Sequence, residues 1–259
     1  IDDPRSKYII EASRGEVISY AINNEADIMA VDIDLSPWGV SFRVQGKMNF
    51  SINMNLTGLF NVYNTLSAIG CGYAMGLSAE QIKEGLEMVK GVAGRFEMVD
   101  KGQDFSVIVD YAHTPDGMEN VLTTALEFVK GNIIVVFGCG GDRDRGKRPK
   151  MGKMAVKYGD FAVLTSDNPR SEEPIDIIKD IEEGIKDSGV PYMIIPDRRD
   201  AINYAIEKAE DEDMVIIFGK GHETYQIFKD KTISFDDREV ASEAIEEKKL
   251  KMVNKDGQG

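Results

Sequence analysis

Short apolar runs, separated by polar residues, occupy the N-terminal part of the chain. They lie at residues 17–20, 28–31, 39–44 and 50–54. In the last two runs hydrophobic and polar positions alternate with a period of two, which is typical of half-buried antiparallel strands. From Leu59 the apolar positions recur at helical spacing and predict a helix that ends near Met75. Ser78 and Gln81 have the spacing of a capping box, which predicts that a second helix begins at Ser78.

A different pattern begins at Phe105. Continuous apolar runs, which predict buried strands, lie at residues 105–109, 133–137, 161–164, 192–195 and 214–218. Amphipathic segments, which predict helices, separate them at residues 116–129, 150–158, 174–187 and 198–209. Such an alternation is typical of a mostly parallel sheet that helices cover on both faces. We therefore predict an α/β protein whose C-terminal part is a doubly wound, Rossmann-like sheet.

The end of the chain departs from this alternation. Residues 225–228 and 232–235 flank a charged turn and predict a hairpin. A last helix is expected to begin near Asp236, and the tail after Lys251 is expected to be frayed.

Small residues from Val92 to Gly94 mark the point where the pattern changes, and they predict a hinge. We therefore expect two domains, residues 1–93 and residues 94–259. The first would combine antiparallel strands with helices, and the second would contain the parallel sheet.

An acidic composition narrows the range of partners. The formal charge is −14 at pH 7 and the pI is near 4.7, which argues against nucleic-acid binding because phosphate contacts require a basic surface. No long uncharged apolar run is present, so we expect no membrane partner and no export. Cys71 and Cys139 are predicted to be buried thiols in a reducing cytoplasm, and Trp38 is predicted to be packed.

Polar and glycine residues follow four of the predicted parallel strands. These loops are residues 110–113, 138–143, 166–170 and 219–223. Ligands of open parallel sheets bind beyond the carboxyl ends of the strands. We therefore expect the four loops to form one binding site.

Two of these loops combine opposite charges. Asp167 and Arg170 flank an Asn-Pro turn, and Glu223 ends a Gly-Lys-Gly-His-Glu run. An arginine fork binds a carboxylate through two parallel hydrogen bonds, and a nearby Asp or Glu binds an ammonium group. This combination favours a small zwitterion, such as an amino acid, as the ligand.

A basic segment between the second strand of this part and its helix has two interpretations. Residues 141–147 have the spacing of a phosphate-binding P-loop up to Lys147, but Arg148 stands where Mg²⁺ coordination needs Ser or Thr. We interpret Arg143 and its neighbours instead as partners for a carboxylate. A solvated charged loop is the alternative.

Other polar residues also allow a structural role. Thr114 and Pro115 predict a helix cap. In a functional interpretation of the same segment, Asp110 would in addition bind a ribose hydroxyl or a water. Asn61 and Asn64 lie one helical turn apart, and a capping or surface role is the simpler interpretation. The spacing of the only two histidines predicts no metal site.

Seven segments in order resemble those of the Mur ligases of bacterial cell-wall synthesis. They are residues 60–64, 94–97, 110–116, 138–149, 167–170, 219–223 and 237–239, so the resemblance covers nearly the whole chain. Among these ligases the chain is most similar to the members that add the third residue of the peptide stem.

The resemblance implies the site residues and the ligands. The Asp-Asn-Pro-Arg run implies that meso-diaminopimelate is the added amino acid, since its second carboxylate, which lysine lacks, would pair with Arg170. The implied diaminopimelate-binding residues are Arg143, Asp167, Asn168, Arg170, Gly219 and Glu223. The implied ATP-binding residues are Asn61, Asn64, Arg95, Asp110 and His113. No catalytic residue and no metal ligand is assigned to this chain.

The implied reaction uses ATP and Mg²⁺. ATP would phosphorylate the free carboxylate of D-Glu in UDP-MurNAc-L-Ala-D-Glu, and the amine of diaminopimelate would attack the acyl phosphate. Such chemistry depends mainly on alignment and on neutralising phosphoryl charge. The alternatives are a lysine-adding or cyanophycin synthetase-like ligase, and a non-catalytic amino-acid-binding module.

In the ligases that it resembles, the P-loop, the Mg²⁺-binding acids and a carbamylated lysine lie in the upstream half of the central domain. These motifs and the UDP-binding domain are not found in this sequence. We therefore expect residues 1–93 to be the second half of a central ATPase domain. The chain alone is expected to bind the amino acid weakly and not to turn over.

Overall fold

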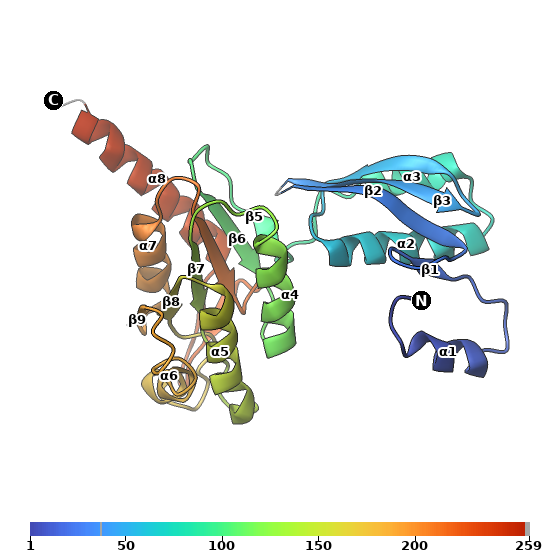
Figure 1. Ribbon diagram of the computed structural model, residues 1–259. Helices are drawn as coiled ribbons and strands as arrows, with labels where there is room; N and C mark the ends of the chain where they lie inside the picture. Colours follow the sequence, from blue (N-terminus) through green and yellow to red (C-terminus); the bar gives the residue numbers. More distant parts are fainter. Residues whose placement is uncertain (37, 257–259) are drawn as a thin grey trace. The chain divides into compact units, whose positions relative to one another are not determined.

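The computed structural model describes residues 1–36 and 38–256, and it forms two compact units (Figure 1). The first unit contains Ile1–Val92, and the second contains Ala93–Gly259. Each unit has its own sheet and its own hydrophobic core.

The first unit is built on a four-stranded sheet in the order β1-β2-β3-β4. Its strands are β1 (Tyr20–Ala21), β2 (Ile28–Ser36), β3 (Gly39–Gly46) and β4 (Phe50–Met54). Its helices are α1 (Ser6–Ala12), α2 (Leu59–Ala74) and α3 (Ala79–Glu87). Strands β3 and β4 pair antiparallel, as their alternating residues predict. Strand β2 also pairs antiparallel with β3, whereas β1 pairs parallel with β2.

Helices α2 and α3 pack against the apolar face of this sheet. Val40, Phe42 and Val44 of β3 are buried at every second position, because successive side chains of a strand point to opposite faces. Helix α3 has the predicted capping box. The Ser78 hydroxyl accepts a hydrogen bond from the N–H of Gln81, and the Gln81 side chain accepts one from the N–H of Ser78.

Three features of the first unit differ from the predictions. The strand predicted at residues 17–20 is reduced to Tyr20–Ala21, because the N–H and hydroxyl of Ser19 donate to the carboxylate of Asp27. Trp38 was predicted to be packed, but it lies between β2 and β3 with 62% of its surface exposed. Helix α1 was not predicted; it buries none of its residues, so no apolar periodicity indicated it.

The second unit contains a six-stranded sheet in the order β5-β6-β10-β7-β8-β9. Its strands are β5 (Glu97–Met98), β6 (Ser106–Asp110), β7 (Ile133–Phe137), β8 (Phe161–Leu164), β9 (Tyr192–Ile194) and β10 (Met214–Phe218). Its helices are α4 (Pro115–Ala125), the 3₁₀ turn η1 (Arg145–Lys147), α5 (Arg148–Tyr158), α6 (Pro174–Glu182), α7 (Arg198–Lys208) and α8 (Asp237–Asp256). The predicted hairpin consists of β11 (Tyr225–Ile227) and β12 (Thr232–Ser234).

Helices cover both faces of the six-stranded sheet, which confirms the predicted doubly wound α/β fold (Figure 1). All its strand pairs are parallel except β5 with β6. Helices α7 and α8 share one core with the sheet, and α4, α5 and α6 pack on the other face. Every residue of β7 and β10 is buried, as a continuous apolar run predicts. Thr114 caps α4 by accepting a hydrogen bond from the N–H of Gly117, as predicted.

The last helix is longer than predicted. Helix α8 continues to Asp256, so the prediction of a frayed tail after Lys251 is wrong up to that residue, and residues 257–259 lie outside the described residues. The ammonium group of Lys248 connects α8 to the end of α7. It donates hydrogen bonds to three carbonyls at the end of α7, those of Ile206, Glu207 and Ala209.

The two cysteines differ in their surroundings, and both are free thiols. Cys139 is buried as predicted, and burial raises the pKa of its thiol to about 12. Cys71 is exposed, so its predicted burial is wrong; the buried residues of α2 include its neighbours Ile69 and Gly72 instead. Within residues 1–36 and 38–256, no helix is long and apolar enough to cross a bilayer.

Candidate functional site

The carboxyl ends of four parallel strands surround a pocket in the second unit. Its volume is about 350 Å³. The loops after β6, β7, β8 and β10 all contribute to it. The lining residues are Tyr111, His113, Gly138, Cys139, Gly140, Arg143, Lys147, Met151, Asp167, Asn168, Arg170, Gly219, Glu223 and Tyr225. This is the position at which open parallel sheets bind their ligands.

All six residues predicted to bind the amino acid line this pocket. They are Arg143, Asp167, Asn168, Arg170, Gly219 and Glu223. His113, which was predicted to contact ATP, lines it as well. Arg95 and Asp110 belong to the same unit but are not part of the lining, and Asn61 and Asn64 belong to the first unit.

Asp167 lies in close contact with the loop after β10. Its Oδ1 accepts a hydrogen bond from the N–H of Asn168 at 2.6 Å. Gly219 has a φ of +115°, and a Cβ at this position would lie 2.5 Å from Oδ2 of Asp167. Only glycine fits here, because it tolerates the backbone conformation and leaves room for the carboxylate. The neighbouring ion pairs join Arg198 to Asp237 and Lys220 to Glu223, so neither cation forms an ion pair with Asp167.

Arg170 has a left-handed backbone, with a φ of +52°, which costs about 1–2 kcal/mol in a residue with a Cβ. Its N–H donates to the carbonyl of Ile227 at 3.0 Å. Its Nη1 donates to the carbonyls of Gly141 at 2.9 Å and Asn168 at 3.3 Å. In the described part of the chain its guanidinium forms no ion pair and no hydrogen bond through Nε or Nη2. One edge of the fork is therefore free for a ligand carboxylate.

Glu223 is partly neutralised by a fully buried lysine. The Nζ of Lys220 lies 3.2 Å from Oε2 of Glu223 and 3.4 Å from Oδ1 of Asn168. The Nδ2 of Asn168 donates to the same Glu223 oxygen at 3.0 Å. These contacts orient Glu223, and they leave Asp167 as the less compensated negative charge. Sequence reasoning missed Lys220, for which its position between two glycines was the only signal.

Strand β11 orders the loop that contains Asp167 and Arg170. Nε2 of the buried Gln226 donates to the carbonyl of Asp167 at 2.7 Å. The N–H of Ile227 donates to Oδ1 of Asn168 at 2.9 Å, and its carbonyl accepts the N–H of Arg170. The hairpin was predicted from sequence, but this supporting role was not.

Asp110 has a structural position beside the pocket. It is buried, and its two oxygens accept the N–H groups of Ala112 and Phe96, each at 2.7 Å. Burial raises the pKa of this carboxyl, while the two N–H groups and the charge of Arg95 oppose that shift. The exposed guanidinium of Arg95 lies 4.9 Å from the centre of the Tyr111 ring. Asp110 thus fixes the segment before β5 to the end of β6.

Arg148 is fully buried and connects two loops of the pocket. Its guanidinium binds Glu172 at 2.8 and 2.9 Å and Asp180 at 2.9 Å. It also donates to the carbonyl of Gly140 at 3.3 Å, while Glu172 accepts the N–H of Asp142 at 2.7 Å. The loop after β7 is therefore tied to the loop after β8. Sequence reasoning used Arg148 only to reject a P-loop, and no local pattern indicated its burial.

The carboxylate of Glu172 predicts an acid-sensitive contribution to stability. The hydrogen bonds from Arg148, followed by that from Asp142, lower its pKa from 4.5 to about 2. A carboxylate with a lowered folded-state pKa stabilises the fold above its unfolded pKa and loses this contribution as the pH falls through the folded pKa. Replacing Glu172 with Gln is expected to lower the free energy of unfolding at pH 7 by about 1–3 kcal/mol.

Urea unfolding at pH 7 and pH 3 measures this effect. The difference between Glu172→Gln and the parent chain is expected to be smaller at pH 3, where the parent carboxylate has begun to lose its contribution. The exposed neighbour Glu173 provides the control, since Glu173→Gln is expected to change stability little at either pH. Equal differences at both pH values for Glu172→Gln would contradict an origin in the charge.

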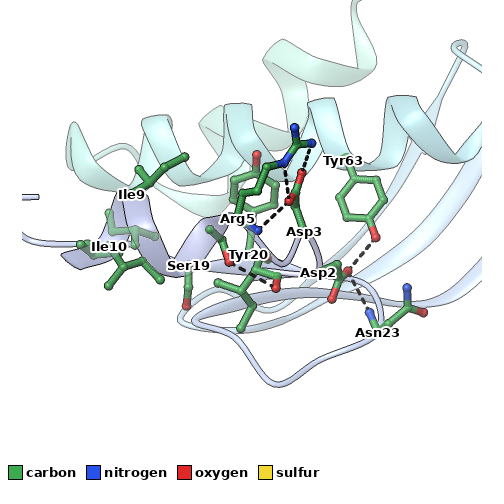
Figure 2. A pocket seen from close by; sticks show the side chains of 13 residues that line it. Asp2, Asp3, Arg5, Ile9, Ile10, Ser19, Tyr20, Asn23 and Tyr63 are labelled. Carbon is green, nitrogen blue, oxygen red and sulfur yellow. Dashed lines mark hydrogen bonds and ion pairs between the residues drawn. The ribbon is translucent and has the colours of Figure 1, made fainter. Parts of the chain in front are cut away.

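A larger hollow, of about 920 Å³, lies in the first unit, where α1 and β1 form part of its wall. Figure 2 shows that Arg5 faces Asp3, whereas Asp2 faces Tyr63 and Asn23. Asp2 accepts a hydrogen bond from the hydroxyl of Tyr63 at 2.6 Å, and Arg5 binds the carboxylate of Asp3. Much of the remaining lining is apolar, including Ile9.

Asn61 and Asn64 do not line this hollow. Nδ2 of Asn61 donates to the carbonyl of Thr57 at 2.8 Å, and its Oδ1 accepts a hydrogen bond from Nδ2 of Asn64 at 3.1 Å. Neither asparagine caps α2, because no side-chain cap hydrogen bond is present at the start of this helix, so the predicted capping role is wrong. Asn64 is exposed, in agreement with the predicted surface role, whereas Asn61 is buried. Their contact with ATP stays a prediction.

Two family descriptions match the chain. The Mur ligase middle domain matches residues 1–72, and the "Mur ligase, glutamate ligase domain" matches residues 94–221. The chain belongs to the Mur ligase family. The second match contains most of the pocket, including Asp167, Arg170 and Gly219.

The chain is also similar to curated Mur ligases. The UDP-N-acetylmuramoyl-L-alanyl-D-glutamate--2,6-diaminopimelate ligase of Geobacillus thermodenitrificans is 51% identical over 251 residues, which are 96% of this chain and 51% of that protein. The protein of the same name from Caldanaerobacter subterraneus is 50% identical over 248 residues, which are 95% of this chain and 51% of that protein. The chain spans about half the length of the curated relatives it matches.

Solved structures agree with the family. A ligase of the same name has a TM-score of 0.67 and 36% identity, and the match covers 95% of this chain and 52% of that chain. The UDP-N-acetylmuramate-alanine ligase from Thermotoga maritima has a TM-score of 0.64 at 20% identity, covering 90% of this chain and 48% of that chain. The second comparison shows a shared fold alone.

Proposed function

We propose that this chain is the amino-acid-binding part of an ATP-dependent ligase that adds meso-diaminopimelate to UDP-MurNAc-L-Ala-D-Glu. The observation that carries the proposal is the convergence of Arg143, Asp167, Arg170 and Glu223 on one pocket. Their charges match a small molecule that has both carboxylate and ammonium groups. The names of the curated relatives support the same ligand.

The contacts of these residues suggest separate tasks. Asp167 has no ion-pair partner in the described part of the chain, so it would bind an ammonium group. Arg170 has one free edge of its fork and would bind the distal carboxylate, which lysine lacks. Among residues 1–36 and 38–256, the guanidinium of Arg143 donates only to the carbonyl of Asp142, at 3.0 Å, and it would bind the other carboxylate. Glu223, already oriented by Lys220, would complete the ammonium site.

ATP, when bound, would supply the phosphoryl group that activates the D-Glu carboxylate as an acyl phosphate. The residues of the pocket would hold diaminopimelate so that its amine can reach that carbon, and such positioning can account for several kcal/mol of a barrier. Contacts of ATP with Asn61, Asn64, Arg95, Asp110 and His113 remain part of the proposal. Because ATP is the proposed co-substrate, we place the reaction in the cytoplasm.

Mg²⁺ would accompany ATP in this reaction. Residues 1–36 and 38–256 contain no group of three or more His, Cys, Asp or Glu side chains suited to a metal ion. We therefore assign no described residue as a Mg²⁺ ligand.

Calorimetric titration of the chain with meso-diaminopimelate and with L-lysine tests the proposed ligand. We expect meso-diaminopimelate to bind at least about tenfold more tightly, because one charged hydrogen-bonded contact is worth about 1.5–3 kcal/mol. A preference for L-lysine would favour a lysine-adding ligase. Equal affinities would contradict the proposed recognition of the second carboxylate.

A further inference from the structure

A fully buried ion pair lies at the carboxyl ends of β8 and β10. Arg198 is the first residue of α7 and Asp237 is the first residue of α8, and both side chains are fully buried. Nε of Arg198 donates to Oδ1 of Asp237, and Nη2 donates to Oδ2, each at 2.7 Å. Neither residue lines the pocket.

The same guanidinium also contacts the backbone of two pocket loops. Nη1 of Arg198 donates to the carbonyl of Ser166 at 3.2 Å, and Nη2 donates to that of Phe218 at 2.9 Å. Ser166 directly precedes Asp167, and Phe218 directly precedes Gly219. Strands β8 and β10 are not neighbours, because β7 lies between them. No hydrogen bond between these two strands therefore sets the spacing of their ends.

We propose that Arg198 is a positioning residue for the amino-acid pocket and that Asp237 holds its guanidinium in place. This inference deepens the proposed function and rests on it for the identity of the ligand. The spacing matters because the Asp167 carboxylate fits against Gly219 with no room for a Cβ between them. A small separation of the two loops would move the carboxylate that is proposed to bind an ammonium group.

Stability alone gives a weaker account of this pair. Buried ion pairs can often be replaced by apolar residues of similar size without loss of stability, since desolvation offsets much of the attraction. Apolar residues cannot, however, donate hydrogen bonds to the carbonyls of Ser166 and Phe218. The positive charge of Arg198 also interacts favourably with Asp167 and Glu223. The first effect acts on the residues that directly precede Asp167 and Gly219, and the second acts on Asp167 and Glu223, which line the pocket.

The double variant Arg198→Met/Asp237→Leu tests the proposal. It removes both charges of the pair together, so neither Arg198 nor Asp237 is left as an unpaired buried charge, and the fold is expected to persist. We expect the hydrogen-bonded amides of Asn168 and Gly219 to exchange with solvent at least about tenfold faster, because local opening of the loops becomes easier. The amides of β7 are expected to keep the exchange rates of the parent chain. The affinity for meso-diaminopimelate, measured by calorimetry, is expected to fall about tenfold or more.

The neighbouring ion pair provides a matched control. Arg199 and Glu243 also join α7 to α8, but both are exposed, and in the described part of the chain neither side chain forms a hydrogen bond or ion pair with a pocket loop. The double variant Arg199→Met/Glu243→Leu is expected to leave loop exchange and ligand affinity unchanged. If both double variants behave alike, or if the Arg198 variant exchanges and binds like the parent chain, the positioning role is wrong.

Two further outcomes are separable. If the parent chain does not bind meso-diaminopimelate, the proposed function fails, while the exchange rates of Asn168 and Gly219 still decide the positioning role. If the Arg198→Met/Asp237→Leu variant does not fold, Arg198→Lys replaces it. Lysine keeps the charge beside Asp237 but lacks the planar fork that reaches both carbonyls. Exchange rates of this variant equal to those of the parent chain would overturn the proposal.

Discussion

Replacing Arg170 with alanine is expected to weaken meso-diaminopimelate binding about 100-fold and to change L-lysine binding by less than about twofold. The loss corresponds to about 2.7 kcal/mol, within the range for hydrogen bonds to a charged group. L-lysine has no distal carboxylate, so it has no group that depends on the free edge of Arg170. Calorimetric titration of the parent chain and the variant with both ligands measures the two affinities.

The variant preserves the local backbone. Alanine retains a Cβ, so the strain of the left-handed conformation at position 170 is unchanged, and the N–H can still donate to the carbonyl of Ile227. Arg170→Lys keeps a positive charge without the fork and should recover only part of the affinity. Equal losses for both ligands would indicate a distorted loop and would contradict recognition of the second carboxylate.

The strand-end loops could be predicted because their signals are local. Continuous apolar runs predicted β7 and β10, which fixed where each strand stops. The rule that ligands bind beyond the carboxyl ends then grouped residues as far apart in sequence as Arg143 and Glu223. The structure brings these residues to one pocket. Their assignment to diaminopimelate came from the family resemblance and remains a prediction.

The supporting charges could not be predicted, because their partners are distant in sequence. Arg198 lies 39 residues before Asp237, and Arg148 lies 24 residues before Glu172. A charged residue at the start of a predicted helix is ordinarily exposed, and no periodicity indicates that α8 will cover it. The same limitation explains the errors at Cys71 and Trp38, whose exposure depends on which side of an element packs.

The pairing of charges separates residues that support the pocket from residues that can bind a ligand. Arg148, Arg198 and Lys220 are fully buried, and each binds a carboxylate of the protein. Asp167 and Arg170 line the pocket, and in the described part of the chain neither has an ion-pair partner. Buried and paired charges fix the loops, whereas the unpaired charges remain for a zwitterion. Asp167 is itself buried, and because an uncompensated buried charge is costly, an ammonium group of the proposed ligand would be bound favourably beside it.

Replacing Gly219 with alanine is expected to weaken meso-diaminopimelate binding about 100-fold or more and to lower the free energy of unfolding by about 1–3 kcal/mol. A φ of +115° is unfavourable for any residue with a Cβ, and the new methyl group would lie 2.5 Å from Oδ2 of Asp167. The carboxylate must therefore move away from the position proposed for the ligand ammonium. Calorimetry and urea unfolding measure the two effects.

The variant Gly189→Ala distinguishes the effect of backbone strain from the effect of displacing the Asp167 carboxylate. Gly189 has a φ of +77° in the same unit, and a Cβ there would meet nothing within 4 Å. Gly189→Ala is expected to lower stability but to keep the affinity of the parent chain. Combining Gly219→Ala with Asp167→Ala should recover part of the stability, because the clash is relieved, without recovering binding. Normal affinity in Gly219→Ala, or an equal loss in Gly189→Ala, would show that the contact between Gly219 and Asp167 does not position the ligand.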